Sequence, residues 1–265
     1  MKDLISVDFK KEPKYDDNSK IKNFTDYFGI YLGGKGFIED LNLTIPKIYI
    51  PFNINKLAYN KNIKTARKIS KCKNGFSSSN INNLNYHMLN LFQKKTFSYS
   101  VAYSMRLILR KNHKNINDAS IVIYDVEDEI SKDILCEIAK YSKYIIIISS
   151  NINKALKLRD YVSANYGVCP IITRDFKNAF LTADFIITSR KMDFKTKAYI
   201  WSLDSLLDTY NENVIISVSY SVPWRCNNIF LNVSLIGAIL NNMGEKDVGK
   251  AFISNDIILS EIIMK

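Results

Sequence analysis

The feature that most constrains the fold of this chain is an alternation of apolar and amphipathic segments over residues 119–190. Four short runs in this stretch are almost entirely apolar, and segments with helical spacing of apolar residues separate them. The apolar runs cover residues 120–124, 144–149, 170–173 and 185–188. Short apolar strands that alternate with helices are typical of a parallel sheet covered on both faces. The pattern therefore predicts an α/β fold built on a mostly parallel sheet.

The order of the segments predicts three regions in the 265 residues. We expect a smaller, basic α/β domain over residues 1–97, a sheet domain over residues 98–232, and C-terminal helices over residues 233–265 that pack back on the first domain. Further elements are expected as helices at residues 198–210 and 257–264 and as a buried strand at residues 213–219.

Two local patterns mark the first region. Residues 41–52 are alternately apolar and contain Pro46 and Pro51, which predicts an edge strand or an extended segment because proline cannot donate to a sheet ladder. Residues 33–36 read Gly-Gly-Lys-Gly. This run predicts a turn, and a phosphate-binding loop is the alternative.

Positive charge is concentrated in the first half of the chain. Residues 1–118 contain 21 Lys and Arg against 9 Asp and Glu, and no Asp or Glu occurs from Leu41 to Asn117. Within this acid-free window, residues 56–73 have the apolar spacing of a helix. The lysines of its polar face are Lys61, Lys64, Lys68 and Lys71. Such a face is either solvated or binds an anionic partner.

The four cysteines argue against a metal centre. Cys72, Cys136, Cys169 and Cys226 form no Cys-x-x-Cys pair, and their spacings match no zinc pattern. We expect Cys136 and Cys169 in the core and Cys72 on the surface. The N-terminus lacks the apolar run of a signal peptide, and no segment is long and apolar enough to span a membrane. We therefore expect a reduced, cytoplasmic protein with no membrane partner.

Residues 98–220 resemble the nucleotide-binding half of two-domain Rossmann-type proteins, in particular shikimate dehydrogenase and glutamyl-tRNA reductase. The resemblance is carried by the lead-in helix that begins at Ser100-Val101-Ala102, by Ser149-Ser150-Asn151 after the second strand, and by the strand Ala183-Asp184-Phe185-Ile186-Ile187-Thr188-Ser189. It implies a Rossmann-like sheet with helices on both faces and a smaller N-terminal α/β domain. It also implies that residues 149–151 recognise the ribose of an adenosine or its phosphate.

Two further segments are similar to shikimate dehydrogenases in particular. Asn42-Leu43-Thr44-Ile45-Pro46-Lys47 resembles their Asn-Val-Thr-x-Pro-x-Lys segment, with the lysine one residue early, and the segment from Ser219 to Pro223 resembles their Tyr-Asn-Pro segment with an insertion. The resemblance implies that Lys47 is the catalytic lysine. In those enzymes an aspartate of the N-terminal domain assists the lysine, and the acid-free window supplies none. The cysteine setting of glutamyl-tRNA reductases is also missing.

The turn after the first strand departs from the family. A Rossmann protein has Gly-x-Gly-x-x-Gly there, because glycine allows the tight turn and lets the backbone approach the pyrophosphate. This chain has Asp125-Val126-Glu127-Asp128-Glu129 instead. The carboxylates would repel a pyrophosphate and offset the favourable helix dipole. The sequence thus disfavours NAD(P), and a magnesium-bridged ligand is the alternative in which these acids would help.

Ligands of such sheets bind beyond the carboxyl ends of the strands. This rule predicts one crevice with Lys47 across from it. The predicted crevice residues are Asp125, Ser149, Ser150, Asn151, Thr188, Ser189 and Tyr220.

Three functions remain open at this point. The first is a Rossmann-like binding or regulatory protein, a pseudoenzyme on a dehydrogenase scaffold with a small-molecule or nucleotide ligand. The second is an active NAD(P)-dependent oxidoreductase in which Lys47 is catalytic. The third is a nucleic-acid-binding protein that uses its basic N-terminal half.

Overall fold

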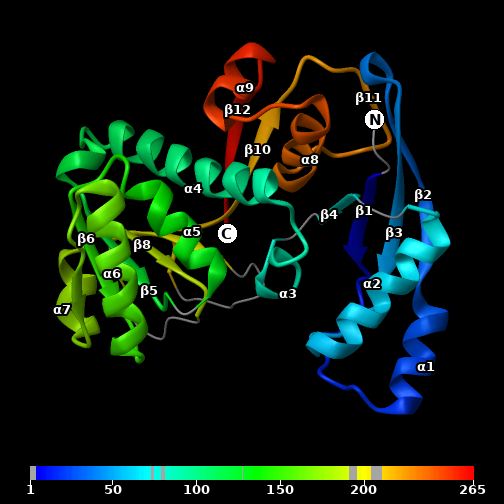
Figure 1. Ribbon diagram of the computed structural model, residues 1–265, viewed down its shortest axis with the longest axis horizontal. Helices are drawn as coiled ribbons and strands as arrows, with labels where there is room; N and C mark the ends of the chain where they lie inside the picture. The colour runs from blue at the N-terminus through cyan, green and yellow to red at the C-terminus, as the bar shows by residue number, and fades with distance from the viewer. Residues whose placement is uncertain (1–3, 73–74, 79–80, 127, 191–195, 204–210) are drawn as a thin grey trace. The chain divides into compact units, whose positions relative to one another are not determined.

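The computed structural model describes residues 4–72, 75–78, 81–126, 128–190, 196–203 and 211–265. The chain forms two compact units (Figure 1), and each is taken by itself below. The first unit consists of Met1–Asn80, His87–Gln93 and Tyr220–Ile258. The second consists of Ile81–Tyr86, Lys94–Ser219 and Leu259–Lys265.

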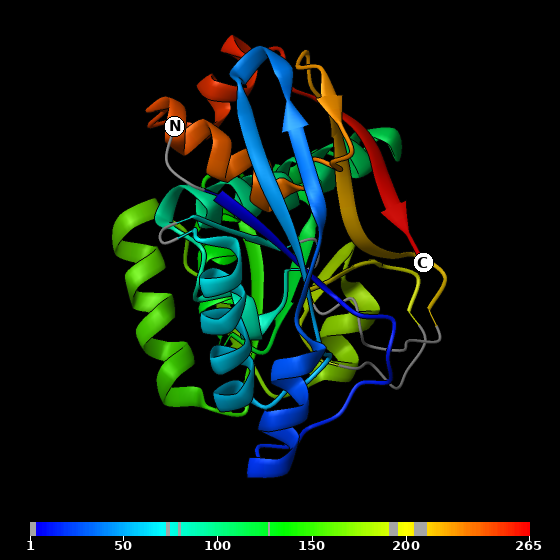
Figure 2. The same cartoon turned by 90° about the vertical axis from the view of Figure 1, so that its right-hand side faces the viewer.

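The first unit is built on a five-stranded sheet in the order β11-β2-β3-β1-β4. Strand β1 is parallel to β3 and β4, whereas β2 is antiparallel to β3 and β11. Figure 2 shows β2 and β3 as a long twisted hairpin with α1 near its lower end. The strands are β1 (Leu4–Phe9), β2 (Tyr31–Ile38), β3 (Leu43–Ile50), β4 (Gly75–Ser78) and β11 (Cys226–Asn227).

Among the residues that the structure describes, four helices lie within this unit. Helix α2 packs against β1 and β3, α1 packs against α2, and α8 packs against β4. Asn55 caps the first turn of α2 by accepting hydrogen bonds from Leu57 and Ala58. The helices are α1 (Lys20–Gly29), α2 (Lys56–Ser70), α8 (Val233–Met243) and α9 (Val248–Ser254).

Strand β3 lies in the middle of the first sheet, so the predicted edge position is wrong. Pro46 is opposite Lys35 of β2, and the described pairing of β3 with β1 begins one residue later, at Lys47. Pro51 comes directly after the strand. Both prolines therefore stand outside the β1–β3 ladder, which explains how a central strand tolerates residues that lack a backbone N–H.

The glycine run at residues 33–36 lies inside strand β2, so the predicted turn is wrong as well. A Cβ at Gly33 would lie 2.1 Å from Cε2 of Tyr49, and one at Gly36 would lie 2.5 Å from Cβ of Ile229. Neighbouring side chains thus cover the strand so closely that only glycine fits there. Gly33 and Gly36 therefore serve close packing, whereas Gly34 has a positive φ of 118° where the β2–β3 register shifts.

The second unit is built on a seven-stranded sheet in the order β12-β10-β9-β8-β5-β6-β7. All described pairings among β5 to β10 are parallel. Counted along the chain from β5, these six strands have the order 3-2-1-4-5-6, which is the Rossmann order. The predicted Rossmann-like α/β fold is confirmed. The strands are β5 (Ser120–Tyr124), β6 (Tyr144–Ile148), β7 (Ile171–Thr173), β8 (Phe185–Thr188), β9 (Tyr199–Ser202), β10 (Val214–Ser221) and β12 (Ile258–Met264).

Helices flank this sheet between its strands. Helix α7 packs against β5, and α6 packs against α5 and β7. Gly167 ends α6 with a left-handed φ of 69°, a conformation that glycine adopts readily at the end of a helix. The helices are α3 (Asn83–Tyr86), α4 (Leu91–Lys111), α5 (Glu129–Ile138), α6 (Ile152–Tyr166) and α7 (Phe176–Thr182).

Two predicted helices are wrong. Residues 199–202 form strand β9, and residues 258–264 form strand β12, the outermost strand next to β10. In β9, Trp201 is buried and its indole N–H donates to Ser104 of α4 over 3.0 Å. In both segments, aromatic or β-branched side chains that fit a pleated surface outweigh a helix-like spacing. Residues 204–210 of the first predicted helix lie outside the described residues.

Two cysteine predictions are also wrong. Cys72 is buried, because the left-handed residue Lys71 ends α2 and turns the chain back toward β1, where the Cys72 sulfur lies 3.9 Å from the Leu4 carbonyl. Cys169 is exposed in the loop that leads into the edge strand β7. Cys169 is exposed because its loop leads into a strand at the edge of the sheet. The apolar neighbours of Cys169 in the sequence did not indicate this position.

Candidate functional site

The candidate site lies where β5 and β8 end. Asp125 follows β5 directly, is buried, and has a left-handed φ of 68°. Its backbone N–H donates to the carbonyl of Ile148, the last residue of β6, over 2.8 Å. In a dinucleotide-binding turn the first glycine stands at this point, because glycine adopts such a φ without strain. Asp125 thus keeps the turn of the glycine and adds a side chain to it.

That side chain forms an ion pair with Arg190, which lies two residues beyond the end of β8. The hydroxyl of Thr188 accepts a hydrogen bond from the backbone N–H of Arg190 over 2.9 Å, so the end of β8 fixes the turn that carries the arginine. The side chain of Asp125 is 7% exposed and that of Arg190 is 49% exposed. The pair therefore joins a buried carboxylate to a guanidinium that reaches solvent.

The other acids of this turn also have partners. Ser189 donates to Asp128 over 3.2 Å, and Glu129 pairs with Lys94 of α4 at 2.6 Å. Glu127 lies outside the described residues. Two of the four acids that the sequence places at this turn, Asp125 and Glu129, are thus paired with a cation of the protein itself.

A pyrophosphate does not fit this turn as described. The Rossmann turn needs backbone N–H groups that approach the phosphate closely, with no side chain between them. Here the carboxylate of Asp125 and the guanidinium of Arg190 form an ion pair across the end of β5. One carboxylate oxygen of Asp125, Oδ1, is buried and has no hydrogen-bond partner among the described residues. A bound phosphate would have to meet this carboxylate or break the pair.

The loop after β6 uses its polar side chains locally. The Ser149 hydroxyl accepts from the backbone N–H of Asn151 over 3.0 Å, and Asn151 caps α6 by accepting from Lys154 over 3.1 Å. Ser150 is exposed. An open hollow of about 450 Å³ adjoins this loop. Its lining residues are Ser150, Asn151, Ile152, Asn153 and Arg174.

The seven predicted crevice residues are distributed over both units. Asp125, Thr188 and Ser189 come together at the ends of β5 and β8, and the loop at residues 149–151 follows the neighbouring strand β6. Tyr220 lies near the end of β10, in the part of that strand that belongs to the first unit, and its ring packs edge-to-face on Phe252 with 5.0 Å between centroids. Lys47 is also in the first unit, half-buried in β3.

The structure places an acid beside Lys47 that the sequence reasoning missed. Strands β1 and β3 are parallel neighbours in which Ser6 pairs with Lys47 and Asp8 pairs with Tyr49. Asp8 and Lys47 therefore project from the same face of the sheet. The Oδ1 atom of Asp8 is buried and has no hydrogen-bond partner among the described residues. Asp8 lies before the acid-free window, and only the pairing of β1 with β3 brings it close.

A tyrosine–carboxyl pair connects α3 and α5. Tyr86 of α3 donates to Asp133 of α5 over 2.8 Å. Burial is the main cause that raises the pKa of both groups, and the charge of Asp133 raises the pKa of Tyr86 further. Lys94, the partner of Glu129, also lies over the Tyr86 ring at 5.2 Å. These contacts tie α3 and α4 to the first two turns of α5.

Arg190 and Arg174 are the cations of this edge that the sequence reasoning missed. Both follow short apolar strands, β8 and β7, at the edge where ligands of such sheets bind. That position was the available signal, but the Lys-rich composition gave no reason to single out one basic residue. No group of three or more His, Cys, Asp or Glu among the described residues is placed to hold a metal ion. In the part of the chain that the structure describes, no helix is both long and apolar enough to cross a membrane.

No protein-family model matches the chain, and a comparison with curated proteins gave no match. Solved structures that are similar to it include a shikimate dehydrogenase in complex with NADP+, at 14% identity and a TM-score of 0.40, with 79% of this chain and 84% of that chain covered. They include a quinate dehydrogenase from Corynebacterium glutamicum in complex with NAD, at 10% identity and a TM-score of 0.39, with 76% and 79% covered. They also include a ligand-free 5-ketofructose reductase from Gluconobacter, at 11% identity and a TM-score of 0.39, with 96% and 98% covered.

Proposed function

We propose that this chain is a Rossmann-like binding or regulatory protein on a two-domain dehydrogenase scaffold and that it lacks conventional dinucleotide binding. The observation that carries this proposal is the ion pair between Asp125 and Arg190 at the turn where a pyrophosphate would lie. A site that had kept its phosphate chemistry would need a bare backbone at that turn. The ion pair between Glu129 and Lys94 nearby supports the same proposal, in which the charges of this turn stabilise the protein itself.

The ligand we propose for this protein is a small anion held at the hollow beside α6. Arg174 supplies a guanidinium, and the side chains of Ser150 and Asn153 supply neutral polar groups. None of the lining residues is acidic. A guanidinium beside neutral polar side chains suits a carboxylate or phosphate group.

Fluorescence titration with NADH and NADPH tests the first part of the proposal. We expect no saturable binding of either nucleotide up to about 1 mM, which corresponds to a binding free energy weaker than about −4 kcal/mol. A micromolar dissociation constant for either nucleotide would contradict it.

Thermal shift with inorganic phosphate tests the small anion. We expect phosphate to stabilise the wild type but not the Arg174→Ala variant.

A second candidate is an NAD(P)-dependent oxidoreductase with Lys47 as the catalytic lysine. The observation that favours it is Asp8, a partly buried acid on the same face as Lys47 in the adjacent strand. Oxidation of shikimate or quinate with NAD+ and NADP+ is the assay. Under this candidate Lys47→Ala abolishes the activity and Asp8→Asn lowers it, while Lys35→Ala on the neighbouring strand leaves it intact. Absence of turnover in the wild type would exclude this candidate for both substrates.

A further inference from the structure

Helix α1 has its polar and apolar faces reversed relative to an ordinary surface helix. Its most buried residue is Asp26, and Lys22 and Asn23 on the same side are half-buried. Its large apolar residues all point outward. An outward apolar face is informative, because a single surface helix of a globular protein normally turns that face to the core.

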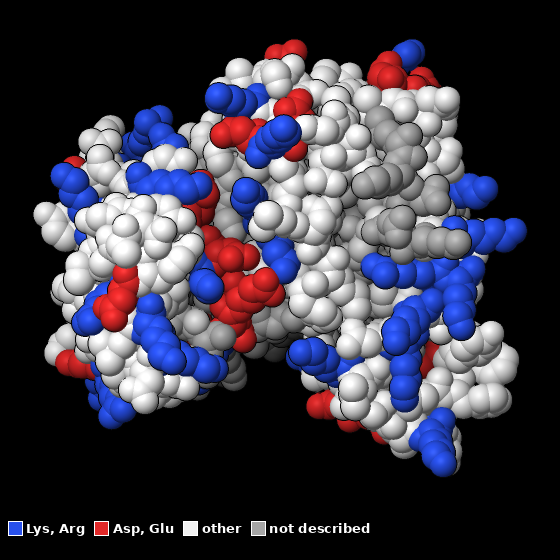
Figure 3. Space-filling view, viewed as in Figure 1, with Lys and Arg blue, Asp and Glu red and all other residues white. Residues whose placement is uncertain are grey.

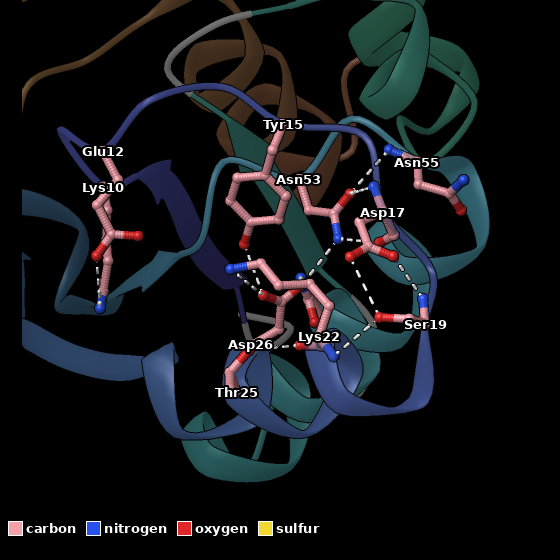
Figure 4. Close-up of polar contacts among 11 residues, drawn as sticks. Lys10, Glu12, Tyr15, Asp17, Ser19, Lys22, Thr25, Asp26, Asn53 and Asn55 are labelled. Atoms are coloured by element: carbon pink, nitrogen blue, oxygen red, sulfur yellow. Dashed lines mark hydrogen bonds and ion pairs between the residues drawn. The ribbon is translucent and has the colours of Figure 1, made fainter.

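A network of hydrogen bonds holds the polar face of α1 inward (Figure 4). Asp26 accepts from the Tyr15 hydroxyl at 2.6 Å, from Asn53 at 2.9 Å and from Asn62 at 3.3 Å. Asn53 also donates to the carbonyl of Asp17 at 2.6 Å, which ties the segment before α1 to the same network. Rotation of the helix to bury its apolar face would break these bonds and leave buried polar groups unpaired. The outward direction of the apolar face is therefore built into the fold.

The outward face is large and continuous. Ile21, Phe24 and Phe28 are spaced three and four residues apart, so they lie on one side of the helix, and Tyr27 adjoins them. Their exposed fractions range from 58% for Tyr27 to 80% for Ile21. The Phe28 ring packs edge-on against Phe24 at 4.9 Å and against Tyr27 at 5.5 Å. The side chains thus form one apolar ridge, which we call the α1 ridge.

Lysines of the adjoining helix border the α1 ridge. Lys61, Lys64 and Lys68 are exposed along one side of α2, which packs against α1, and Lys61 reaches Asn18 at the start of α1 over 3.4 Å. Figure 3 shows this basic side chain cluster over α2, next to uncharged surface at α1. Among the described residues none of the three lysines forms an ion pair. We call them the α2 stripe.

We propose that the α1 ridge and the α2 stripe together bind the surface of an anionic lipid bilayer. Aromatic and aliphatic side chains on one helical face, bordered by lysines, are the features of helices that lie in the headgroup region of a membrane. The lysines match anionic headgroups in charge, whereas a second copy of this chain would bring the same positive charge to the interface. Ile21 can neither stack on a base nor form a hydrogen bond, so the ridge suits lipid better than nucleic acid. The expectation of no membrane partner considered only spanning segments.

Vesicle flotation of the full chain tests this proposal. We expect the protein to float with vesicles of phosphatidylcholine and phosphatidylserine and not with vesicles of phosphatidylcholine alone, and to be released by high salt. Phe24→Ser/Phe28→Ser should lower the partition coefficient at least roughly tenfold, because the apolar contact is lost. Lys61→Gln/Lys64→Gln/Lys68→Gln should lower it roughly 100-fold through the loss of attraction to anionic headgroups.

Control variants carry changes of the same kind elsewhere on the surface. Leu181→Ser removes another highly exposed apolar side chain, and Lys154→Gln/Lys157→Gln removes exposed lysines of α6; neither should change flotation. Circular dichroism checks that each variant is folded. The proposal is overturned if the wild type binds neither vesicle at low salt or if the ridge and stripe variants float like the wild type. Two other results would also overturn it, both in the case where the wild type does not bind vesicles. In the first, the variants lose binding to single-stranded RNA; in the second, they lose self-association in sedimentation.

Discussion

Asp125 and Arg190 form an ion pair at the carboxyl edge of the second sheet. Asp125 occupies a left-handed position that glycine fills at lower cost, and its buried carboxylate needs the cation that Arg190 supplies. Two residues that are far apart in the sequence therefore depend on each other.

A double-mutant cycle measures this dependence. We expect Arg190→Ala to lower the free energy of unfolding by about 1–3 kcal/mol, because it leaves the Asp125 carboxylate buried without its cation. The same substitution in an Asp125→Gly background should cost less than about 0.5 kcal/mol, since no buried charge remains to be compensated. Urea unfolding of the four proteins gives the coupling. Equal costs in the two backgrounds would show that the ion pair contributes nothing.

Tyr15 gives the first unit an alkaline limit. Burial raises its pKa most, and the hydrogen bond to Asp26 and the charge of Asp26 raise it further. The folded state thus favours the neutral phenol, so this contribution to stability is complete below the unfolded pKa of about 10 and is lost as pH rises above it. We expect Tyr15→Phe to flatten the decline of unfolding free energy between about pH 10 and 11. Tyr144→Phe, at an exposed tyrosine, should leave the decline unchanged.

At the scale of elements, the orientation of α1 depends on one carboxylate. Asp26 links α1 to the segment before it through Tyr15, to the loop after β3 through Asn53, and to α2 through Asn62. Three donors would lose their acceptor if it were removed. The helix has few buried apolar contacts of its own to replace them, because its apolar side faces outward.

Removal of this carboxylate should therefore destabilise the first unit strongly. We expect Asp26→Ala to lower the free energy of unfolding by about 2–4 kcal/mol, because buried donors are left unpaired. Asp160→Ala, on the exposed side of α6, should change it by less than about 0.5 kcal/mol. Chemical denaturation followed by circular dichroism makes the comparison. A cost for Asp26→Ala as small as that of the control would mean that the network does not hold α1.

For the whole molecule, the sequence was sufficient for strands β5, β6, β7, β8 and β10 of the second sheet, but not for β9 and β12. Apolar strands such as residues 120–124 and 144–149 are continuous and separated by capped helices, and such strands are specified by local pattern. The failures came where a segment's neighbours decide its structure. Residues 33–36 lie in a strand in which Tyr49 packs over Gly33 and Ile229 over Gly36, and residues 258–264 form a strand beside β10.

Only part of the candidate site could be predicted from the sequence. The loop ends of β5, β6 and β8 could be named from the strand rhythm, because the carboxyl ends of parallel strands share one edge. Arg190 as the partner of Asp125 and Asp8 as a neighbour of Lys47 could not, since each pairing depends on strand order and register. The inward polar face of α1 also depends on contacts with Asn53 and Asn62, which the sequence keeps far from Asp26.

Calorimetric titration of NADPH into the wild type and into Asp125→Gly/Arg190→Ala tests most directly whether the ion pair excludes the dinucleotide. We predict no saturable heat for the wild type up to about 1 mM and binding at least about tenfold tighter for the double variant, because the variant restores a glycine to the turn. Thermal melting of both proteins confirms that each is folded. Micromolar binding by the wild type, or weaker binding once the pair is removed, would contradict the account.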